Sequence, residues 1–173
     1  VAKIREWIAQ GDTYQTNFTF RLLAEFEGDP LGLFQTLYQA QPTNCAAFVD
    51  LGRFAICSAS PELFFERHGN RLVSKPMKGT AARGENPTSD VTNAQGLALD
   101  PKNRAENLMI VDMLRNDMGR VAQVGSVTVP RLFEVERYPT LLQMTSTVTA
   151  RTRASVVKIL ASLFPCASVT GAP

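Results

Sequence analysis

The sequence predicts a protein of the α+β class whose strands pair in the antiparallel sense. Apolar and polar residues alternate over residues 143–150, which is typical of a strand with one buried face. Several short strand-like runs are separated by turns that contain Gly or Asn, and such turns favour hairpins. Helical periodicity is confined to a few separate segments, so the strands outnumber those of a regular series of alternating strands and helices.

The first half of the chain is predicted to contain two helices and a set of strands. Apolar residues at helical spacing over residues 4–8 predict a helix that ends at Gly11. Residues 12–26 alternate between apolar and polar side chains, which predicts one long strand. A second helix is expected to begin at Asp29-Pro30, because proline is favoured in the first turn. Shorter strands are expected as hairpins, at residues 46–49 with 54–57 and at residues 63–66 with 71–74.

The second half is predicted to begin with an irregular segment. Pro76 and Gly79 stop both helix and strand, so residues 75–84 are predicted to be a stiff connection and residues 81–90 a surface loop. Further helices are expected over residues 91–99, 103–118 and 155–163, and further strands over residues 127–129, 132–136 and 143–150.

We expect one domain that is incomplete. No repeat and no linker interrupts the sequence, which predicts that residues 1–173 are part of a single domain. The chain begins without Met inside a helical pattern and stops without a closing element. We therefore expect a piece of a larger protein, truncated at both ends.

The composition is that of an ordinary globular protein. With 173 residues, of which 45% are hydrophobic and 20% charged, the chain is long enough for a hydrophobic core. The basic residues are scattered and the net charge is only +2, so a nucleic-acid surface is poorly supported. No apolar run has the length of a membrane span. A single histidine and three cysteines without metal-ligand spacing argue against a zinc site and favour a reducing, cytoplasmic environment.

A basic, glycine-containing segment over residues 75–84 holds a candidate nucleophile. Lys78 is one of three cations there, and neighbouring cations lower one another's pKa because each protonation makes the next costlier. A free lysine has a pKa near 10.4 and is protonated at neutral pH, so a nucleophilic lysine needs a pKa that is lower by about 3. Lys78 is a candidate for this role. The alternative is a solvated basic turn that binds an anion or nothing.

Several motifs together resemble the chorismate-utilising enzymes. In chain order they are Gly11-Asp12-Thr13-Tyr14-Gln15-Thr16-Asn17, Ser60-Pro61-Glu62-Leu63-Phe64, Pro76-Met77-Lys78-Gly79-Thr80 with Arg83-Gly84, Ala105-Glu106-Asn107-Leu108-Met109-Ile110-Val111-Asp112 with Arg115-Asn116-Asp117, Ser146-Thr147-Val148, and Thr170-Gly171-Ala172-Pro173. The resemblance covers nearly the whole chain. It implies one chorismate-binding catalytic domain with antiparallel sheets packed together and helices on the outside, as in anthranilate synthase component I.

Two positions discriminate between the branches of this family. Isochorismate and salicylate synthases carry a water-activating lysine where this sequence has Gln15, and a neutral amide cannot act as a general base. The second position is Lys78. Anthranilate synthases resemble Pro-Ile-Ala-Gly-Thr here, whereas aminodeoxychorismate synthases have Pro-Ile-Lys-Gly-Thr, to which Pro76-Met77-Lys78-Gly79-Thr80 is similar. The resemblance therefore implies the component I branch of aminodeoxychorismate synthase, which serves para-aminobenzoate and folate synthesis.

The resemblance also implies a mechanism. Lys78 would attack C2 of chorismate as the C4 hydroxyl leaves, and ammonia from a glutaminase partner would displace the lysine to give 4-amino-4-deoxychorismate. Glu62 is the implied general acid/base, a task that calls for a carboxyl pKa raised by burial. Thr80 would orient Lys78 or the substrate. Mg²⁺ would be held by Glu106 and by a second carboxylate outside the chain.

Substrate contacts are implied for three further residues. Thr170 and Gly171 match the family's substrate-contacting turn. Gln143 stands where many members have His, so it can hydrogen-bond the substrate but cannot shuttle a proton, which leaves more of the acid–base work to Glu62. Residues that grip the enolpyruvyl tail are expected outside the chain, so the chain alone is not expected to turn over. Two alternatives stay open: an anthranilate synthase component I with an unusual lysine, and a chorismate-binding piece without chemistry.

Overall fold

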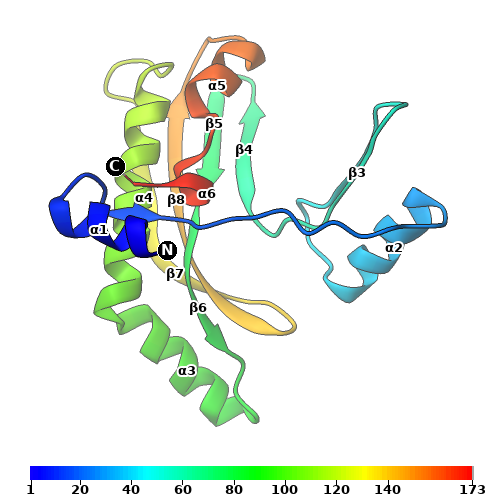
Figure 1. Ribbon diagram of the computed structural model, residues 1–173. Helices are drawn as coiled ribbons and strands as arrows, with labels where there is room; N and C mark the ends of the chain where they lie inside the picture. Colours follow the sequence, from blue (N-terminus) through cyan, green and yellow to red (C-terminus); the bar gives the residue numbers. More distant parts are fainter. Residues whose placement is uncertain (173) are drawn as a thin grey trace. The chain divides into compact units, whose positions relative to one another are not determined.

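The computed structural model describes residues 1–172 and divides into two compact units (Figure 1). The larger unit contains Val1–Phe18 and the residues from Phe64 onward, and the smaller unit contains Thr19–Leu63. No helix in the described part of the chain is both long enough and apolar enough to cross a lipid bilayer.

A five-stranded sheet forms the centre of the larger unit. Its longest strand, β8 (Leu141–Arg151), pairs along one edge with β7 (Thr128–Arg137) in the antiparallel sense. Along the other edge, β5 (Arg71–Lys75) pairs with the second half of β8 and β6 (Met77–Ala82) with the first half, both antiparallel. β4 (Leu63–His68) lies beside β5. β8 is paired on both edges, and its even-numbered residues from Leu142 to Ala150 are buried, whereas most of its odd-numbered residues are only partly buried.

The sheet continues through the segment that the sequence predicts as an irregular connection. Pro76 separates β5 from β6, but its carbonyl oxygen accepts a hydrogen bond from the backbone N–H of Ser146 at 3.2 Å. The prediction of a connection over residues 75–84 is therefore wrong. Proline lacks a backbone N–H and removes one hydrogen bond from the ladder, but its carbonyl oxygen can still pair with the neighbouring strand. The predicted surface loop is shorter than expected, since β6 runs to Ala82.

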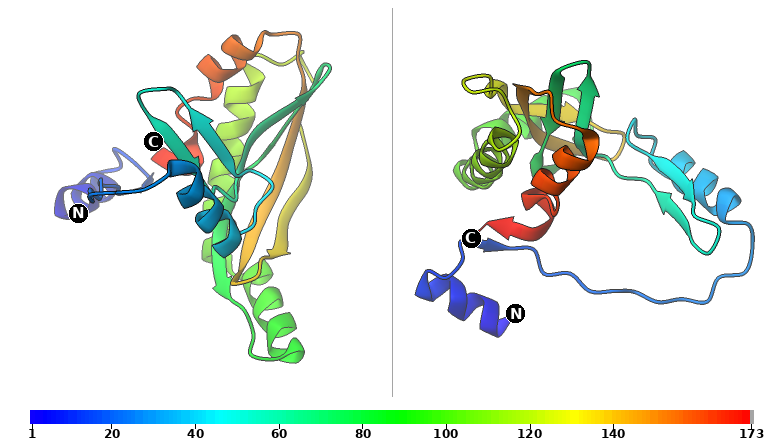
Figure 2. Two further views of the ribbon diagram at one scale, coloured as in Figure 1. Left: turned by 90° about the vertical axis from the view of Figure 1, so that its right-hand side faces the viewer. Right: turned by 90° about the horizontal axis from the view of Figure 1, so that it is seen from above.

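Two consecutive helices follow β6. The first, α3 (Pro87–Leu99), starts before the predicted residue 91, because Asn86 forms a capping box with Ser89 that sequence periodicity alone does not reveal. The second, α4 (Pro101–Gly119), begins after Asp100, whose carboxylate accepts the Asn103 N–H at 2.7 Å. Figure 2 shows α4 on one face of the sheet.

The hydrophobic core lies between the sheet, α4 and α5 (Val156–Leu163). Its buried side chains are Leu72, Val111, Leu114, Met118, Val148, Ala150, Ile159 and Leu163. A second cluster joins α3 to β8 and consists of Ala94, Leu97, Leu142 and Met144. On α4 the inner face includes Asn107, which is buried, whereas the apolar Leu108 is exposed. Hydrophobic periodicity cannot detect a buried asparagine.

The first and last described segments of the larger unit pair with each other. α1 (Ala2–Gln10) ends at Gly11, which adopts the predicted left-handed cap. The next strand, β1 (Gln15–Thr16), pairs antiparallel with β9 (Gly171–Ala172), which follows the short helix α6 (Ala167–Thr170). The long strand predicted for residues 12–26 is wrong. Alternation indicates that a segment has two different faces but does not supply a pairing partner, and residues 17–26 form no ladder.

The smaller unit is a helix and a hairpin. α2 (Pro30–Ala40) begins as predicted, and its N-cap Asp29 accepts hydrogen bonds from two backbone N–H groups. The predicted hairpin is β2 (Ala47–Asp50) with β3 (Ala55–Ser58). The Phe34 and Phe48 rings pack at a centroid distance of 5.9 Å, which joins the helix to the hairpin.

Candidate functional site

A β-bulge in β6 fixes the backbone around Lys78. The pairing of β6 with β8 shifts register across Lys78 and Gly79. Gly79 has a φ of 101°, a left-handed conformation that residues with side chains rarely adopt. A Cβ atom at this glycine would lie 3.0 Å from Cβ of Asn103 and 3.2 Å from Cβ of Met144. Both the dihedral angle and the lack of space require glycine, which gives the segment that carries Lys78 a defined path.

Lys78 is held at its backbone and at its amine. Its carbonyl oxygen accepts a hydrogen bond from Nδ2 of Asn107 on α4 at 3.3 Å. Its Nζ donates to Oδ1 of Asn17, also at 3.3 Å. Nδ2 of Asn17 in turn donates to the carbonyl oxygen of Ser168 at 2.9 Å. The backbone N–H of Asn17 donates to the carbonyl oxygen of Thr170 at 3.2 Å. The amine therefore lies where the segment after β1 meets the C-terminal turn.

The predicted substrate-contacting turn lies at this junction. Gly171 pairs with Thr16 in the ladder between β1 and β9, and the hydroxyl of Thr170 donates to the carbonyl oxygen of Cys166 at 3.3 Å. The structure thus brings both predicted residues to the segment that contacts Lys78, while their contact with substrate stays a prediction. Pro173 of the same motif lies outside the described residues.

Gln15 carries an unpaired acceptor on β1. Its Oε1 is buried and has no hydrogen-bond partner among residues 1–172. A buried oxygen without a donor costs free energy, so such atoms in a native protein call for a specific explanation. An acceptor next to the strand that positions the Lys78 amine is suited to a donor that arrives with a ligand.

Thr80 and Gln143 form a second predicted pair. They are register partners on β6 and β8, and Oγ1 of Thr80 donates to Oε1 of Gln143 at 2.9 Å. Nε2 of Gln143 donates to the carbonyl oxygen of Gly79 at 2.9 Å. The amide of Gln143 therefore links Thr80 to the bulge beside Lys78. The structure brings both residues to the predicted site.

Glu106 lies on α4, one residue before the asparagine that holds Lys78. Its side chain is 32% exposed and pairs with Lys102, at 3.7 Å and one helical turn away. An exposed pair at this distance contributes little, so the carboxylate is available to another cation. No group of three or more His, Cys, Asp or Glu side chains that could hold a metal occurs among residues 1–172. Mg²⁺ commonly takes one or two carboxylates with water and substrate oxygens, so Glu106 fits as a partial ligand set.

Glu62 belongs to the smaller unit. Its backbone N–H donates to Oγ of Ser60 at 3.3 Å, and the hydroxyl of Thr43 donates to the carbonyl oxygen of Ser60 at 2.8 Å. These bonds fix the turn before β4. The predicted acid–base role of Glu62 stays a prediction.

The cations that flank Lys78 in the sequence are paired with carboxylates. Lys75 forms an ion pair with Glu136, which also accepts hydrogen bonds from Thr145 at 3.0 Å and Tyr138 at 3.2 Å. Burial alone would raise the pKa of Glu136, but Lys75 and the hydroxyl donors outweigh it and hold this pKa below its ordinary value of 4.5. Arg83 pairs with Asp90 at 2.6 Å. Lys75 and Arg83 are therefore each paired with a carboxylate, which their spacing in the sequence does not reveal.

Asp90 is a buried carboxylate that the sequence analysis missed. It is 7% exposed and accepts hydrogen bonds from Arg83, from Nε of Arg137 at 3.1 Å and from the Gly84 N–H at 3.0 Å. Hydrogen bonding to Arg83 is the main cause that holds the pKa of Asp90 well below its ordinary value of 3.8. A Cβ atom at Gly84 would lie 2.0 Å from the Asp90 nitrogen, so this glycine is required for the contact. The cluster fixes the end of β6 against the start of α3.

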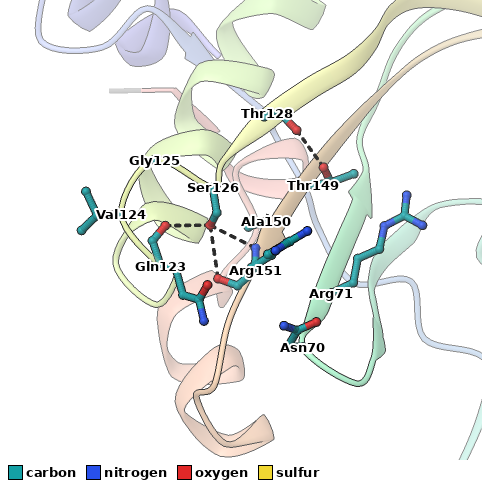
Figure 3. Close-up of a pocket in the computed structure, with 10 residues that line it drawn as sticks. All are labelled: Asn70, Arg71, Gln123, Val124, Gly125, Ser126, Thr128, Thr149, Ala150 and Arg151. Atoms are coloured by element: carbon teal, nitrogen blue, oxygen red, sulfur yellow. Dashed lines mark hydrogen bonds between the residues drawn. The ribbon is translucent and has the colours of Figure 1, made fainter.

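A cavity of about 690 Å³ lies at the other end of β8 (Figure 3). Arg71 and Arg151, which are register partners on β5 and β8, line it together with the loop that contains Gln123 and Ser126. None of the predicted site residues lines this cavity. It is therefore separate from the site around Lys78.

Comparison with known proteins supports the sequence resemblance. The model of the chorismate binding enzyme family matches residues 1–173. The chain is 44% identical over 173 residues to aminodeoxychorismate synthase component 1 of Salmonella typhimurium, covering 99% of the chain and 38% of that protein. It is 38% identical over 175 residues to an anthranilate synthase component 1 of Haloarcula marismortui, covering 100% of the chain and 36% of that protein.

A solved structure has the same fold. The chain superimposes on anthranilate synthase component I from Streptococcus pneumoniae with a TM-score of 0.83 and 30% identity, covering 99% of the chain and 38% of that structure. The predicted α+β fold of the anthranilate synthase component I type is therefore confirmed. The chain spans well under half the length of these relatives.

Proposed function

Because the chain belongs to the chorismate binding enzyme family, we propose that its protein is component I of an aminodeoxychorismate synthase. The proposed reaction converts chorismate and ammonia to 4-amino-4-deoxychorismate and water, for para-aminobenzoate and folate synthesis. The observation that carries the proposal is the Lys78 amine. It is held by a neutral amide oxygen at 3.3 Å and sits beside the turn of Thr170 and Gly171.

Lys78 is proposed to act as a covalent nucleophile. Its neutral amine forms a C–N bond to C2 of chorismate, the ring double bonds shift, and the C4 hydroxyl leaves as water after it receives a proton. Ammonia then attacks C4, the double bonds shift back, and Lys78 leaves from C2. The acceptor Oδ1 of Asn17 is suited to this role, because it orients the amine by one hydrogen bond without adding a negative charge that would favour the ammonium form.

The remaining site residues are proposed to assist these steps. Glu62 donates the proton to the departing hydroxyl. Thr80 and Gln143, which are hydrogen-bonded to each other at 2.9 Å, present a hydroxyl and an amide to the substrate. Gln15 replaces the lysine that would activate water, and its buried, unpaired oxygen favours a donor such as ammonia or a substrate hydroxyl.

Glu106 is proposed to bind Mg²⁺ together with a carboxylate outside the described residues. When bound, the ion would supply positive charge to a carboxylate of chorismate and polarise the ring. A glutaminase subunit or domain is proposed as the source of ammonia. The relative from Salmonella typhimurium is named as component 1 of its enzyme, which supports a second component.

An anthranilate synthase is the second candidate function. The relative from Haloarcula marismortui and the solved structure from Streptococcus pneumoniae carry that name at 38% and 30% identity. Lys78 favours amination at C4, because a covalent lysine has no part in forming the ortho product by direct attack of ammonia at C2.

Product analysis separates the candidates. The complete protein is incubated with chorismate, ammonia and Mg²⁺, and products are resolved by chromatography. Aminodeoxychorismate supports the proposal, fluorescent anthranilate supports the second candidate, and unconsumed chorismate supports a binding module. The Lys78→Ala variant is expected to lose amination while it keeps its melting temperature. Wild-type rates in that variant would refute the covalent role.

A further inference from the structure

A chain of buried hydrogen bonds leads from β7 to Lys78. The backbone N–H of Phe133 donates to Oγ of Ser146 at 3.1 Å. The Ser146 hydroxyl donates to Oδ1 of Asn107 at 2.5 Å, and Nδ2 of Asn107 donates to the carbonyl oxygen of Lys78 at 3.3 Å. Ser146 is 0% exposed and Asn107 is 1% exposed, so water cannot replace these contacts.

The donors and acceptors in this series of hydrogen bonds allow only one orientation of the Asn107 amide. If the Asn107 amide were turned over, its oxygen would face the Lys78 carbonyl oxygen, and two acceptors would oppose each other. The Ser146 hydroxyl has one proton, which it gives to Asn107, while its lone pair receives the Phe133 N–H. Each group in the chain therefore fixes the next one.

The two ends of this series of hydrogen bonds, at Phe133 and at Lys78, both lie against α4. Phe133 has a φ of 59°, which is unusual for a residue with a side chain, and the Arg104 guanidinium lies 4.6 Å from the centre of its ring. Asn103 packs against Gly79, directly after Lys78. Neighbouring residues of one helix thus set the positions of β6, β7 and β8 around the amine.

We infer that Asn107 and Ser146 are positioning residues for Lys78. They hold its carbonyl group at the bulge, so that the amine reaches Asn17 and the C-terminal turn. Neither side chain needs to touch substrate. The inference rests on the proposed nucleophilic role of Lys78, because the position of this carbonyl matters to the rate only if the amine attached to the same residue reacts.

A matched pair of serine variants tests the inference in the complete protein. Ser146→Ala removes the hydroxyl that links Phe133 to Asn107. Ser74→Ala removes a similarly buried hydroxyl, which donates to the Phe64 carbonyl oxygen at 2.6 Å in the same sheet. Misplacing a reacting group lowers the rate by on the order of 10- to 100-fold, so we expect kcat of Ser146→Ala to fall in this range. We expect its KM for chorismate to stay within about twofold, and Ser74→Ala to keep kcat. Equal losses of kcat in the two variants would overturn the inference.

A double variant separates this inference from the proposed function. The residual rate of Lys78→Ala is measured at saturating ammonia; if Ser146 acts through Lys78, adding Ser146→Ala lowers this residual rate no further, because the two effects share one step. A further loss equal to that of Ser146→Ala alone would overturn the positioning role and leave the nucleophile intact. Wild-type activity in Lys78→Ala alone would instead overturn the proposed function, and the inference with it.

The neighbouring metal candidate requires its own control, since Asn107 follows Glu106. Asn107→Asp keeps the shape of the side chain but turns an oxygen toward the Lys78 carbonyl oxygen. We expect kcat to fall on the order of tenfold or more while the Mg²⁺ concentration at half-maximal rate stays within about twofold. A shift of that concentration as large as in Glu106→Gln would overturn the inference, because the loss would then act through the metal.

Discussion

Arg83 and Asp90 form a charged contact in which Nε lies 2.6 Å from Oδ1, at the point where β6 ends and α3 begins. Nη2 of the same guanidinium lies 3.3 Å from the other carboxylate oxygen, so the contact is bidentate. Arg137 on β7 donates to this carboxylate as well. One buried carboxylate therefore ties together three elements beside the candidate site.

The stability of the protein is expected to depend on Asp90 in acid. Its pKa is lower in the folded state than its ordinary value of 3.8, so the carboxylate stabilises the fold above that pH. This contribution is lost as the pH falls through the lower, folded value. Asp90→Asn should lower the melting temperature at pH 7 and reduce its decline below about pH 4. Melting curves at several pH values measure both effects. Asp112→Asn, which removes an exposed pair with Arg115, is the control and should change little.

Gly79→Ala is expected to damage both stability and activity. The left-handed φ of 101° and the close Cβ of Asn103 would cost about 1–3 kcal/mol of unfolding free energy. Gly96→Ala is the control, since Gly96 lies inside α3 with nothing within 4 Å of an added Cβ, and should gain about 0.5–1 kcal/mol. Denaturant titrations measure the two changes. A neutral Gly79→Ala variant would show that the bulge is not required.

Thr80→Val is expected to slow the proposed reaction without unfolding the protein. The substitution removes the hydrogen bond to Gln143, and the amide can then turn away from the substrate. Loss of one such bond should lower kcat/KM by about 2- to 12-fold. Thr128→Val removes a comparable bond to Thr149 at 2.9 Å on the same sheet, away from the site, and should keep wild-type kinetics. Steady-state rates of both variants distinguish a role at the site from a general effect on the sheet.

Glu106→Gln is expected to weaken Mg²⁺ binding in the proposed reaction. A neutral amide binds Mg²⁺ more weakly than a carboxylate, so the half-saturating Mg²⁺ concentration should rise by about tenfold or more. Lys102→Ala removes the pair at 3.7 Å and should not raise that concentration. An unchanged Mg²⁺ titration in Glu106→Gln would remove this residue from the metal site.

Local signals in the sequence predict much of the fold. Asp29 and Pro30 predict the start of α2, and Gly11 predicts the end of α1. Helix caps can be predicted in this way because they depend on residues that are close in the sequence. The alternation over residues 143–150 identifies β8, whose neighbours bury every second side chain. The motifs around Lys78, Thr80 and Gln143 also predict residues that the structure brings together.

Features that depend on distant partners could not be predicted. Residues 12–26 alternate like a strand, yet only β1 finds a partner, and that partner lies at the far end of the sequence. Pro76 is predicted to break the strand because proline lacks a backbone N–H. The sequence gives no sign that its carbonyl oxygen still accepts a hydrogen bond from a distant strand. Asn107 and Asp90 are buried polar groups whose donors lie on other elements, so hydropathy indicates exposure where the structure has none.

The short ladder between β1 and β9 has a consequence for biosynthesis. Asn17 is held by residues near position 170, so those residues must leave the ribosome before Asn17 can be fixed as the acceptor of the Lys78 amine. A nascent polypeptide that ends before this point can complete most of the sheet and still lack an oriented amine. The orientation of the Lys78 amine therefore depends on residues that are translated long after Asn17.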